Sequence, residues 1–188
     1  MTSGNRRWLI SGGLGSGKSE VRRLLERSGL RTIDADSVGH SVLAEEARDA
    51  VSDRWPQAIS NGEVDRRALA AIVFDDPGEL AALEAITHPL IFGRIEAELE
   101  GFEDVAVVEV PLIDTSLGWP RMVVDGPDEV RLQRAVTRGM AQDDAERRMK
   151  SQPDRAEWLA SADLVIPNHG TLAELEATVA ILAEYLSS

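Results

Sequence analysis

Residues 12–19 read Gly-Gly-Leu-Gly-Ser-Gly-Lys-Ser and fit the pattern G-x-x-x-x-G-K-[ST] of a phosphate-binding loop. The apolar run Trp8–Ile10 before it predicts a buried strand, and the spacing of residues 20–26 after it predicts a helix. Strand, glycine loop and helix form the setting in which this pattern binds a nucleoside triphosphate. The alternative is a glycine-rich turn with a surface lysine. The agreement of both flanks favours the phosphate site.

The residue types of the loop suit a triphosphate. Four of the eight residues are glycine, so backbone N–H groups can approach the phosphates and positive φ is permitted. The helix that follows directs its N-terminus at the same anion. Lys18 supplies a point charge for the β and γ groups, and the hydroxyl of Ser19 suits Mg²⁺, which takes oxygen ligands.

Composition narrows the classes of partner. The chain has 188 residues, a net charge of −13 and no cysteine. The charge disfavours nucleic acid and anionic membranes, and the lack of cysteine excludes disulfides, thiolate catalysis and cysteine zinc sites. No apolar run approaches a membrane span, and the polar start of the chain resembles no signal peptide. We expect a cytoplasmic protein that acts on small molecules, without nucleic acid, membrane or obligate protein partner.

Arginines gather in one part of this acidic chain, and an anion site needs such a cluster. For any single arginine, an exposed helix face paired with Asp or Glu is the better interpretation; for the group beside a phosphate loop, a role with anions is favoured. The cluster comprises Arg121, Arg131, Arg134, Arg138, Arg147, Arg148 and Arg155.

Short apolar runs alternate with helical spacing, which predicts an α/β fold with a mostly parallel sheet and helices on both sides. The expected strands are 8–11, 30–33, 105–110, 164–166 and a fifth, shorter run at 122–124. The expected helices are 19–27, 37–50, 65–74, 77–98, 128–138, 143–152 and 172–186, with Asp143 as a candidate cap.

Ligands of such sheets bind at the carboxyl ends of the strands. The phosphate loop, the pair Asp34 and Asp36, and Pro111 each follow a predicted strand, so they should share one edge. We expect one domain over residues 1–188, with a core of about 1–35, 101–126 and 160–188. The segment of about 36–100 holds no convincing strand and should form a separate helical lobe, and about 127–159 is a candidate lid.

Asp34 and Asp36 are two residues apart, so in an extended chain their carboxylates point the same way. One could accept the proton of an attacking hydroxyl while the other helps to hold a metal or the loop. The alternative is helix capping by Asp36 or Ser37. The neighbouring phosphate loop favours the functional interpretation.

Three further features have both a functional and a structural interpretation. Pro89 should interrupt the helical run and leave His88 at the break, where a structural histidine is the commoner case. Glu109 ends the most apolar strand and either lies near Mg²⁺ or is a satisfied edge residue. Residues 162–170 form a strand that Pro167 ends and a turn in which Gly170 permits positive φ; the turn cups an adenine base or simply connects two elements.

Taken in order, these pieces resemble the dephospho-CoA kinase family. The resemblance runs from Ile10 to about Leu175. Besides residues 12–19 and 33–36, the matching stretches are Asn61–Leu69 with Val73-Phe74, Ile86–Ile91 around His88-Pro89, Val110–Ile113, Arg148–Gln152 and Ala162–Gly170. The phosphate loop alone is generic, but the ordered combination is specific.

The resemblance implies a P-loop kinase-like fold with a helical acceptor-binding lobe and a helical lid. It implies phosphorylation of the ribose 3′-hydroxyl of dephospho-CoA by ATP, with Mg²⁺. Asp36 would be the base, Lys18 would hold phosphates, Ser19 would ligate the metal, and Arg134 would stabilise the transferring group. The other implied residues are Gly13, Leu14, Gly15, Ser16, Gly17, Glu20 and Asn168 for ATP, Asp34, Arg66 and His88 for the acceptor, and Arg138 and Arg148 in the lid.

This chain departs from the family pattern at four of its residues, which bear on the acceptor contacts more than on the reaction. Two other functions share part of the pattern. Another small-molecule kinase, such as a nucleoside or nucleotide kinase, would have the loop and the arginines but no use for the His-Pro and Asp-Arg stretches. The other alternative is a nucleotide-dependent switch or a regulatory ATPase. A switch that uses GTP would need an Asn-Lys-x-Asp motif, which is absent. The departures are Glu20, His40, Asp114 and Arg131.

Overall fold

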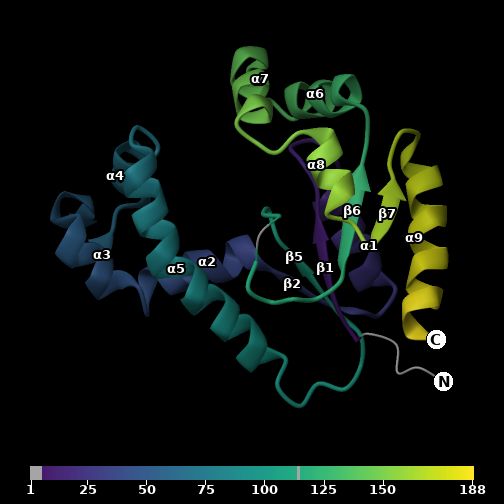
Figure 1. Cartoon of the computed structure of the whole chain (residues 1–188), viewed down its shortest axis with the longest axis horizontal. Coiled ribbons are helices and arrows are strands. Elements are labelled where there is room, and N and C mark those ends of the chain that lie inside the picture. Colours follow the sequence, from purple (N-terminus) through teal and green to yellow (C-terminus); the bar gives the residue numbers. More distant parts are fainter. Residues whose placement is uncertain (1–5, 114) are drawn as a thin grey trace. The chain divides into compact units, whose positions relative to one another are not determined.

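The computed structural model describes residues 6–113 and 115–188. Asp114, one of the four departures from the family's sequence pattern, lies outside the described residues. Five parallel strands form the main sheet in the order β2-β5-β1-β6-β7 (Figure 1). The expected strands are confirmed, including the short fifth one. Their bounds are β1 Arg7–Ser11, β2 Arg31–Asp34, β5 Ala106–Glu109, β6 Arg121–Asp125 and β7 Leu164–Pro167.

The helices connect these strands and build a separate segment between β2 and β5. A short hairpin and a single 3-10 turn, Pro56–Ala58, also lie in that segment. The helices are α1 Lys18–Arg27, α2 Ala35–Ala44, α3 Arg48–Arg54, α4 Arg66–Val73, α5 Pro77–Glu98, α6 Asp128–Thr137, α7 Gln142–Lys150, α8 Arg155–Ala160 and α9 Leu172–Ser187.

The chain divides into two compact units, one made of residues up to Asp34 together with Phe102–Ser188, the other of Ala35–Gly101. In the first unit α1 and α9 pack against each other and against the sheet. Leu9 and Ile10 of β1, whose side chains point to opposite faces, are both buried, so the sheet is covered on both sides. The core of this unit contains Ile10, Val21, Leu25, Val107, Met122, Val124, Ile166 and Val179.

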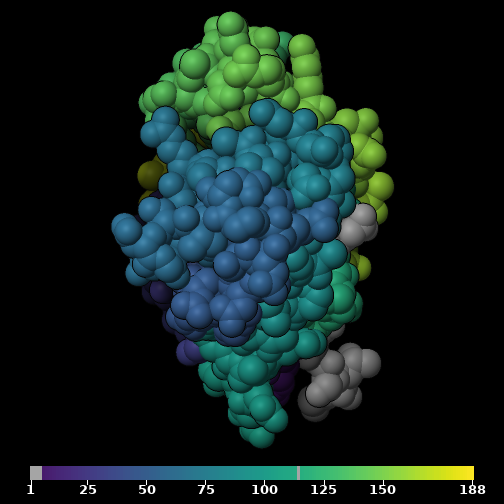
Figure 2. Space-filling view, turned by 90° about the vertical axis from the view of Figure 1, so that its left-hand side faces the viewer, coloured from purple at the N-terminus to yellow at the C-terminus, as the bar shows by residue number. Residues whose placement is uncertain are grey.

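The second unit has its own apolar core, and Figure 2 shows the surface of this unit in blue and teal. Trp55 is buried in the core, and its indole N–H donates to Glu79 at 2.7 Å. The single helix expected at 37–50 is wrong, because α2 ends at Ala44 and α3 begins at Arg48. The break brings Ala47 into the core, while Arg94 of α5 pairs with Glu45 and Glu46 at the break.

The helix break predicted at Pro89 is also wrong. Helix α5 runs without interruption from Pro77 to Glu98. Apolar side chains on both sides of Pro89, among them Ile86 and Leu90, pack into the same core. Proline costs about 3 kcal/mol in a helix interior, and the packing of α5 on both sides of Pro89 offsets that cost.

Three smaller elements of the structure differ from those expected from the sequence. Strands β3 (Ile59–Ser60) and β4 (Glu63–Val64) form a hairpin where no strand was expected. Its turn is Asn61-Gly62, with φ of 53° and 81°, the turn chemistry of a two-residue hairpin. Helix α8 was not expected either, although Asp154 and Glu157 form its capping box. Asp143 caps nothing, because α7 begins at Gln142 after an N-cap at Ala141.

Gly170 differs from its expected conformation. It is not among the glycines with positive φ in the described chain. A Cβ at this position would overlap the carboxylate of Glu174. That carboxylate accepts from the N–H of Thr171 at 2.7 Å and closes the capping box of α9. A glycine is therefore required here because a larger residue would displace the capping carboxylate. The positive φ expected for Gly170 is wrong.

Candidate active site

The phosphate loop lies between β1 and α1 in the conformation that its glycines permit. Gly12, Gly15 and Gly17 have φ of 145°, 74° and 99°. Gly17 is the N-cap of α1 and no described side chain caps this helix, so its first N–H groups are open to a ligand. The loop thus has the anion-binding geometry predicted from its sequence.

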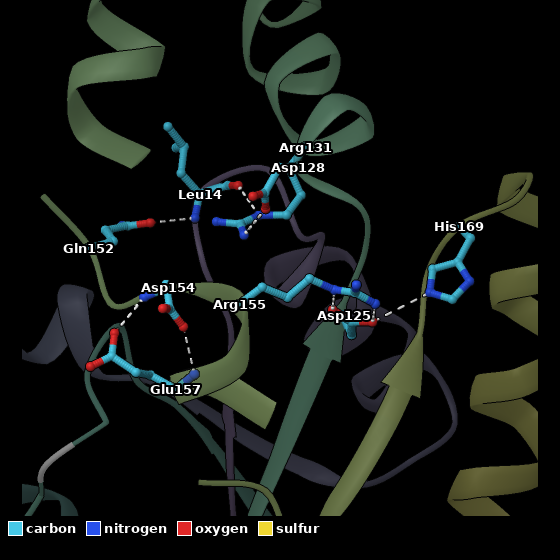
Figure 3. A network of polar contacts seen from close by, with 9 residues as sticks. All are labelled: Leu14, Asp125, Asp128, Arg131, Gln152, Asp154, Arg155, Glu157 and His169. Carbon is cyan, nitrogen blue, oxygen red and sulfur yellow. Dashed lines mark hydrogen bonds and ion pairs between the residues drawn. The ribbon is translucent and has the colours of Figure 1, made fainter. Parts of the chain in front are cut away.

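Two residues of the segment 127–159 hold the middle of the loop (Figure 3). The N–H of Leu14 donates to Gln152 Oε1 at 2.7 Å, and the carbonyl of Leu14 accepts from Arg131 Nε at 3.0 Å. Arg131 is 4% exposed and also donates to Asp128 at 2.9 Å. Burial lowers the pKa of Arg131, and the neighbouring Asp128 and Asp125 oppose this shift.

The loop between β7 and α9 also contacts the phosphate loop. The buried side-chain amide of Asn168 donates to the carbonyl of Ser16 at 2.7 Å. Arg134 of α6 in turn donates to the carbonyl of Asn168 at 3.0 Å, to its Oδ1 at 3.1 Å and to the carbonyl of Gly170 at 3.4 Å. In this structure the guanidinium of Arg134 therefore anchors Asn168, and its expected role at the transferring group stays a prediction.

Ser19 meets a carboxylate from the end of β5. Its hydroxyl donates to Glu109 Oε1 at 2.6 Å. The other oxygen, Oε2, accepts from Arg22 Nε at 2.8 Å, and Arg22 Nη2 lies 3.5 Å from Asp34 Oδ2. Glu109 is thus a paired carboxylate at the loop, and its partner Arg22 was not predicted from the sequence.

The chemistry of these groups fits Mg²⁺. The described residues contain no group of three His, Cys, Asp or Glu side chains that could hold a metal by itself. Mg²⁺ sites in kinases use one or two protein oxygens and complete the shell with water and phosphate. Ser19 Oγ and Glu109 Oε1 supply oxygens of the required kind.

Two charged residues of the loop region differ in their surroundings. The side chain of Lys18 is half-buried and makes no hydrogen bond or ion pair within residues 6–113 and 115–188, so its ammonium group is available to an anion. Glu20 pairs with Arg23 one helical turn further along α1. A carboxylate beside the bound phosphates would be electrostatically unfavourable, and the pairing with Arg23 neutralises its charge.

A cleft of about 550 Å³ adjoins the loop within the first unit. Arg138 lines it, while Arg148 lies outside this lining and pairs with Asp144 at 3.1 Å on the surface of α7. Both remain predicted lid residues. The cleft lining consists of Leu14, Gly15, Ala135, Arg138, Gly139, Met140, Ala141 and Asp144.

Asp125 at the end of β6 forms a further polar cluster (Figure 3). Arg155 donates to both of its oxygens, at 2.8 and 2.7 Å, and His169 Nε2 lies 3.5 Å away. The hydrogen bond from Arg155 lowers the pKa of Asp125, with a smaller contribution from His169, and burial opposes the shift.

Arg121, another arginine of the predicted cluster, makes structural contacts. Its guanidinium donates to Ser11 and to the carbonyls of Leu112 and Ile113.

The second unit carries the other predicted site residues. Asp36 is exposed in the first turn of α2; because β2 ends at Asp34, the extended geometry expected for this pair is wrong. Arg66 donates to His40 Nε2 at 2.6 Å, and both line a cavity of about 210 Å³. His88 is half-buried, with its ring centroid 5.7 Å from that of Phe92.

A sequence model of the family described as dephospho-CoA kinase matches residues 9–174. The chain belongs to the dephospho-CoA kinase family. Among curated members, the family's protein in Streptomyces avermitilis is 40% identical over 181 residues, which cover 90% of this chain and 88% of the relative. The member from Thermus thermophilus is 36% identical over 183 residues, covering 93% and 89%.

Solved structures agree with this membership of the dephospho-CoA kinase family. A Thermus thermophilus crystal structure superposes with a TM-score of 0.82 at 33% identity, covering 97% of this chain and 98% of the other. The dephospho-CoA kinase of Campylobacter jejuni gives 0.75 at 25%, covering 97% of each chain. Shikimate kinase from Acinetobacter baumannii superposes with a TM-score of 0.56 at 16% identity, covering 97% of this chain and 94% of the other, and shares the fold.

In the part of the chain that the structure describes, no helix is long and apolar enough to cross a membrane.

Proposed function

We propose that this chain transfers the γ-phosphoryl group of ATP to the ribose 3′-hydroxyl of dephospho-CoA, giving coenzyme A and ADP, the last step of coenzyme A synthesis. The observation that carries the proposal is an open phosphate loop in a chain whose residues 9–174 match the family model. Phosphoryl transfer needs positioning and charge neutralisation more than covalent chemistry, and the site offers both.

The first unit would bind ATP. The N–H groups from Gly13 to Ser19 would surround the phosphates, and Lys18 would approach the β and γ groups. Ser19 and Glu109 would hold Mg²⁺, which when bound would neutralise charge on the phosphates. Asn168 would position the loop beneath the nucleotide through its contact with the carbonyl of Ser16.

The second unit would bind the acceptor. Asp36 would accept the proton of the 3′-hydroxyl, which general base catalysis requires within hydrogen-bond reach. Arg66 and His88 would contact dephospho-CoA, and Asp34, at the end of the first unit's β2, would assist. The arginines of the segment 127–159 would close over the phosphates and exclude water, which otherwise competes as acceptor. We expect this reaction to take place in the cytoplasm.

The experiment that tests the proposal is ADP release from Mg²⁺ and ATP with each of several acceptors. The panel contains dephospho-CoA, adenosine, AMP and shikimate, and one further reaction is run without any acceptor. We expect strong stimulation by dephospho-CoA alone, with one coenzyme A formed for each ADP. Equal or stronger stimulation by another acceptor would overturn the proposal, as would ADP release independent of any acceptor.

The matched control is the Lys18→Ala protein prepared in the same way. It lacks the ammonium group of the loop and should release almost no ADP, which excludes a contaminating kinase. A second control, Lys150→Ala, changes the other lysine of the chain, which is exposed at the end of α7, and should behave like the wild type.

A further inference from the structure

Two carboxylates lie side by side at the carboxyl edge of the sheet. Asp34 of β2 and Glu109 of β5 are partners in the register of these neighbouring parallel strands. Glu109 is 5% exposed, and a carboxylate so deeply buried is costly unless it is paired. Two adjacent carboxylates also repel each other, so this arrangement needs a cation between them.

Arg22 is that cation. It lies three residues after Ser19 on α1, so both side chains project from one face of the helix. Its Nε donates to Glu109 Oε2 at 2.8 Å and its Nη2 lies 3.5 Å from Asp34 Oδ2. The side chain is 18% exposed and also meets Thr32 at 3.5 Å and Glu26 at 3.6 Å. A planar guanidinium can serve several oxygens in fixed directions, which an ammonium group cannot.

The two oxygens of Glu109 thereby have separate partners. Oε2 is engaged by Arg22, and Oε1 faces the hydroxyl of Ser19 at 2.6 Å. We propose that Arg22 is a positioning residue for the Mg²⁺ site: it fixes the rotamer of Glu109 so that one defined oxygen lies beside Ser19. This inference rests on the proposed function, because it assumes that Ser19 and Glu109 serve a metal–nucleotide complex.

The expected effect of losing Arg22 is weaker metal binding. Partners that orient a metal ligand contribute about 10- to 100-fold to metal affinity or activity. Removal of a positive charge works in the opposite direction, and solvent screens this effect only in part, because the Arg22 side chain is 18% exposed. We expect the loss of orientation to dominate, because Arg22 holds Oε2 of Glu109 and thereby sets the direction of Oε1.

The experiment compares Mn²⁺ binding to the ADP complex of the full chain, measured by electron paramagnetic resonance of free Mn²⁺, in four proteins. These are the wild type, Arg22→Met, Arg22→Lys and the control Arg27→Met, which changes an exposed arginine of the same helix. We expect the Mn²⁺ dissociation constant to rise about 10-fold in Arg22→Met, and by less in Arg22→Lys, whose ammonium group can still donate to Glu109 Oε2. The control should match the wild type.

A second readout separates positioning from general stability. The Mg²⁺ concentration for half-maximal turnover should rise in parallel with the Mn²⁺ dissociation constant, while the KM for ATP at saturating Mg²⁺ should stay within about two-fold, since Lys18 and the loop are unchanged. If Arg22→Met does not fold, Arg22→Lys carries the test by itself.

Two results would overturn the inference: an unchanged or lower Mn²⁺ dissociation constant in the folded Arg22 variants, or a loss of thermal stability without any change in metal dependence. Failure of the proposed function would look different. In that case the wild-type protein itself would bind no Mn²⁺ with ADP, or would show no turnover of dephospho-CoA.

Discussion

The hydroxyl of Ser19 lies 2.6 Å from the carboxylate of Glu109, although the two residues are 90 positions apart in the chain. Ser19 stands at the start of α1, and Glu109 ends β5, the strand between β1 and β2 in the sheet. The parallel topology brings the end of β5 beneath the phosphate loop. The two oxygens that we propose to hold Mg²⁺ thus meet at the place where the phosphates of ATP would be held.

Replacement of Glu109 by glutamine should raise the requirement for Mg²⁺. Gln keeps the size of the side chain but removes the charge that a metal needs. We expect the Mg²⁺ concentration for half-maximal turnover to rise and kcat to fall by about 10- to 100-fold. Steady-state kinetics at varied Mg²⁺ measure both. Glu184→Gln, an exposed change on α9, is the control, and normal Mg²⁺ dependence in Glu109→Gln would remove Glu109 from the metal site.

Replacement of Lys18 by alanine should abolish most turnover. The ammonium group is proposed to meet charge that develops on the transferring group, and preorganised groups of this kind contribute about 10²- to 10³-fold to kcat. The measurement is kcat/KM for ATP, with Lys150→Ala as the matched control. Turnover within a few-fold of the wild type would contradict the proposed role of the loop.

Replacement of Asp36 by asparagine should separate binding from chemistry. The amide cannot take the proton of the acceptor hydroxyl, so kcat should fall by about 10²- to 10⁴-fold. ATP affinity, measured by calorimetry, should stay unchanged. Asp53→Asn, an exposed change in α3, serves as the control. Near wild-type kcat would mean that another group, or none, acts as the base.

Arg134 and Asn168 should act together on nucleotide binding. Arg134→Met removes the anchor of Asn168, and Asn168→Ala leaves the carbonyl of Ser16 without its donor. Residues in one hydrogen-bond network show coupling of about 0.5–3 kcal/mol, so the double variant should lose less ATP affinity than the sum of the single variants. Strict additivity would show that Arg134 acts elsewhere, for instance on the transferring group.

The pairing of Asp125 with Arg155 should make stability depend on acid pH. The folded protein lowers the pKa of Asp125 from its ordinary value of 3.8, so this carboxylate stabilises the fold at pH values above about 4. The stabilisation is lost as the pH falls through the lowered pKa, because both states are then protonated. Thermal unfolding of wild type and Asp125→Asn from pH 7 to 2.5 should therefore show a gap that closes below about pH 4. A constant gap would contradict the ionic contribution.

Much of the fold was predictable because its signals are local. Buried parallel strands appear as short apolar runs, and even the brief run at 122–124 belongs to a fully buried strand, β6. Some failures had a signal that was overlooked, such as Asn61-Gly62 in the hairpin and Asp154 with Glu157 at α8. Others had none, because the continuity of α5 through Pro89 depends on packing against residues far away in the chain.

The candidate site divides in the same way. Lys18, Ser19 and the glycines belong to one contiguous motif, so their grouping is visible in the sequence. The partners of the arginines are not. Arg131 reaches Leu14 and Arg134 reaches Asn168, and such pairs depend on how separate loops meet.

The sequence by itself determined the phosphate loop, the alternation of strands and helices and the resemblance to one kinase family, because each depends on residues close together in the chain or on their order. Only the tertiary structure decided which side chains support the loop. Arg22 meets Glu109 across 87 positions because the strand order places β5 beside β1 and α1. A charged side chain pairs with a group that tertiary packing brings within about 3 Å, and the local sequence does not determine which group that is.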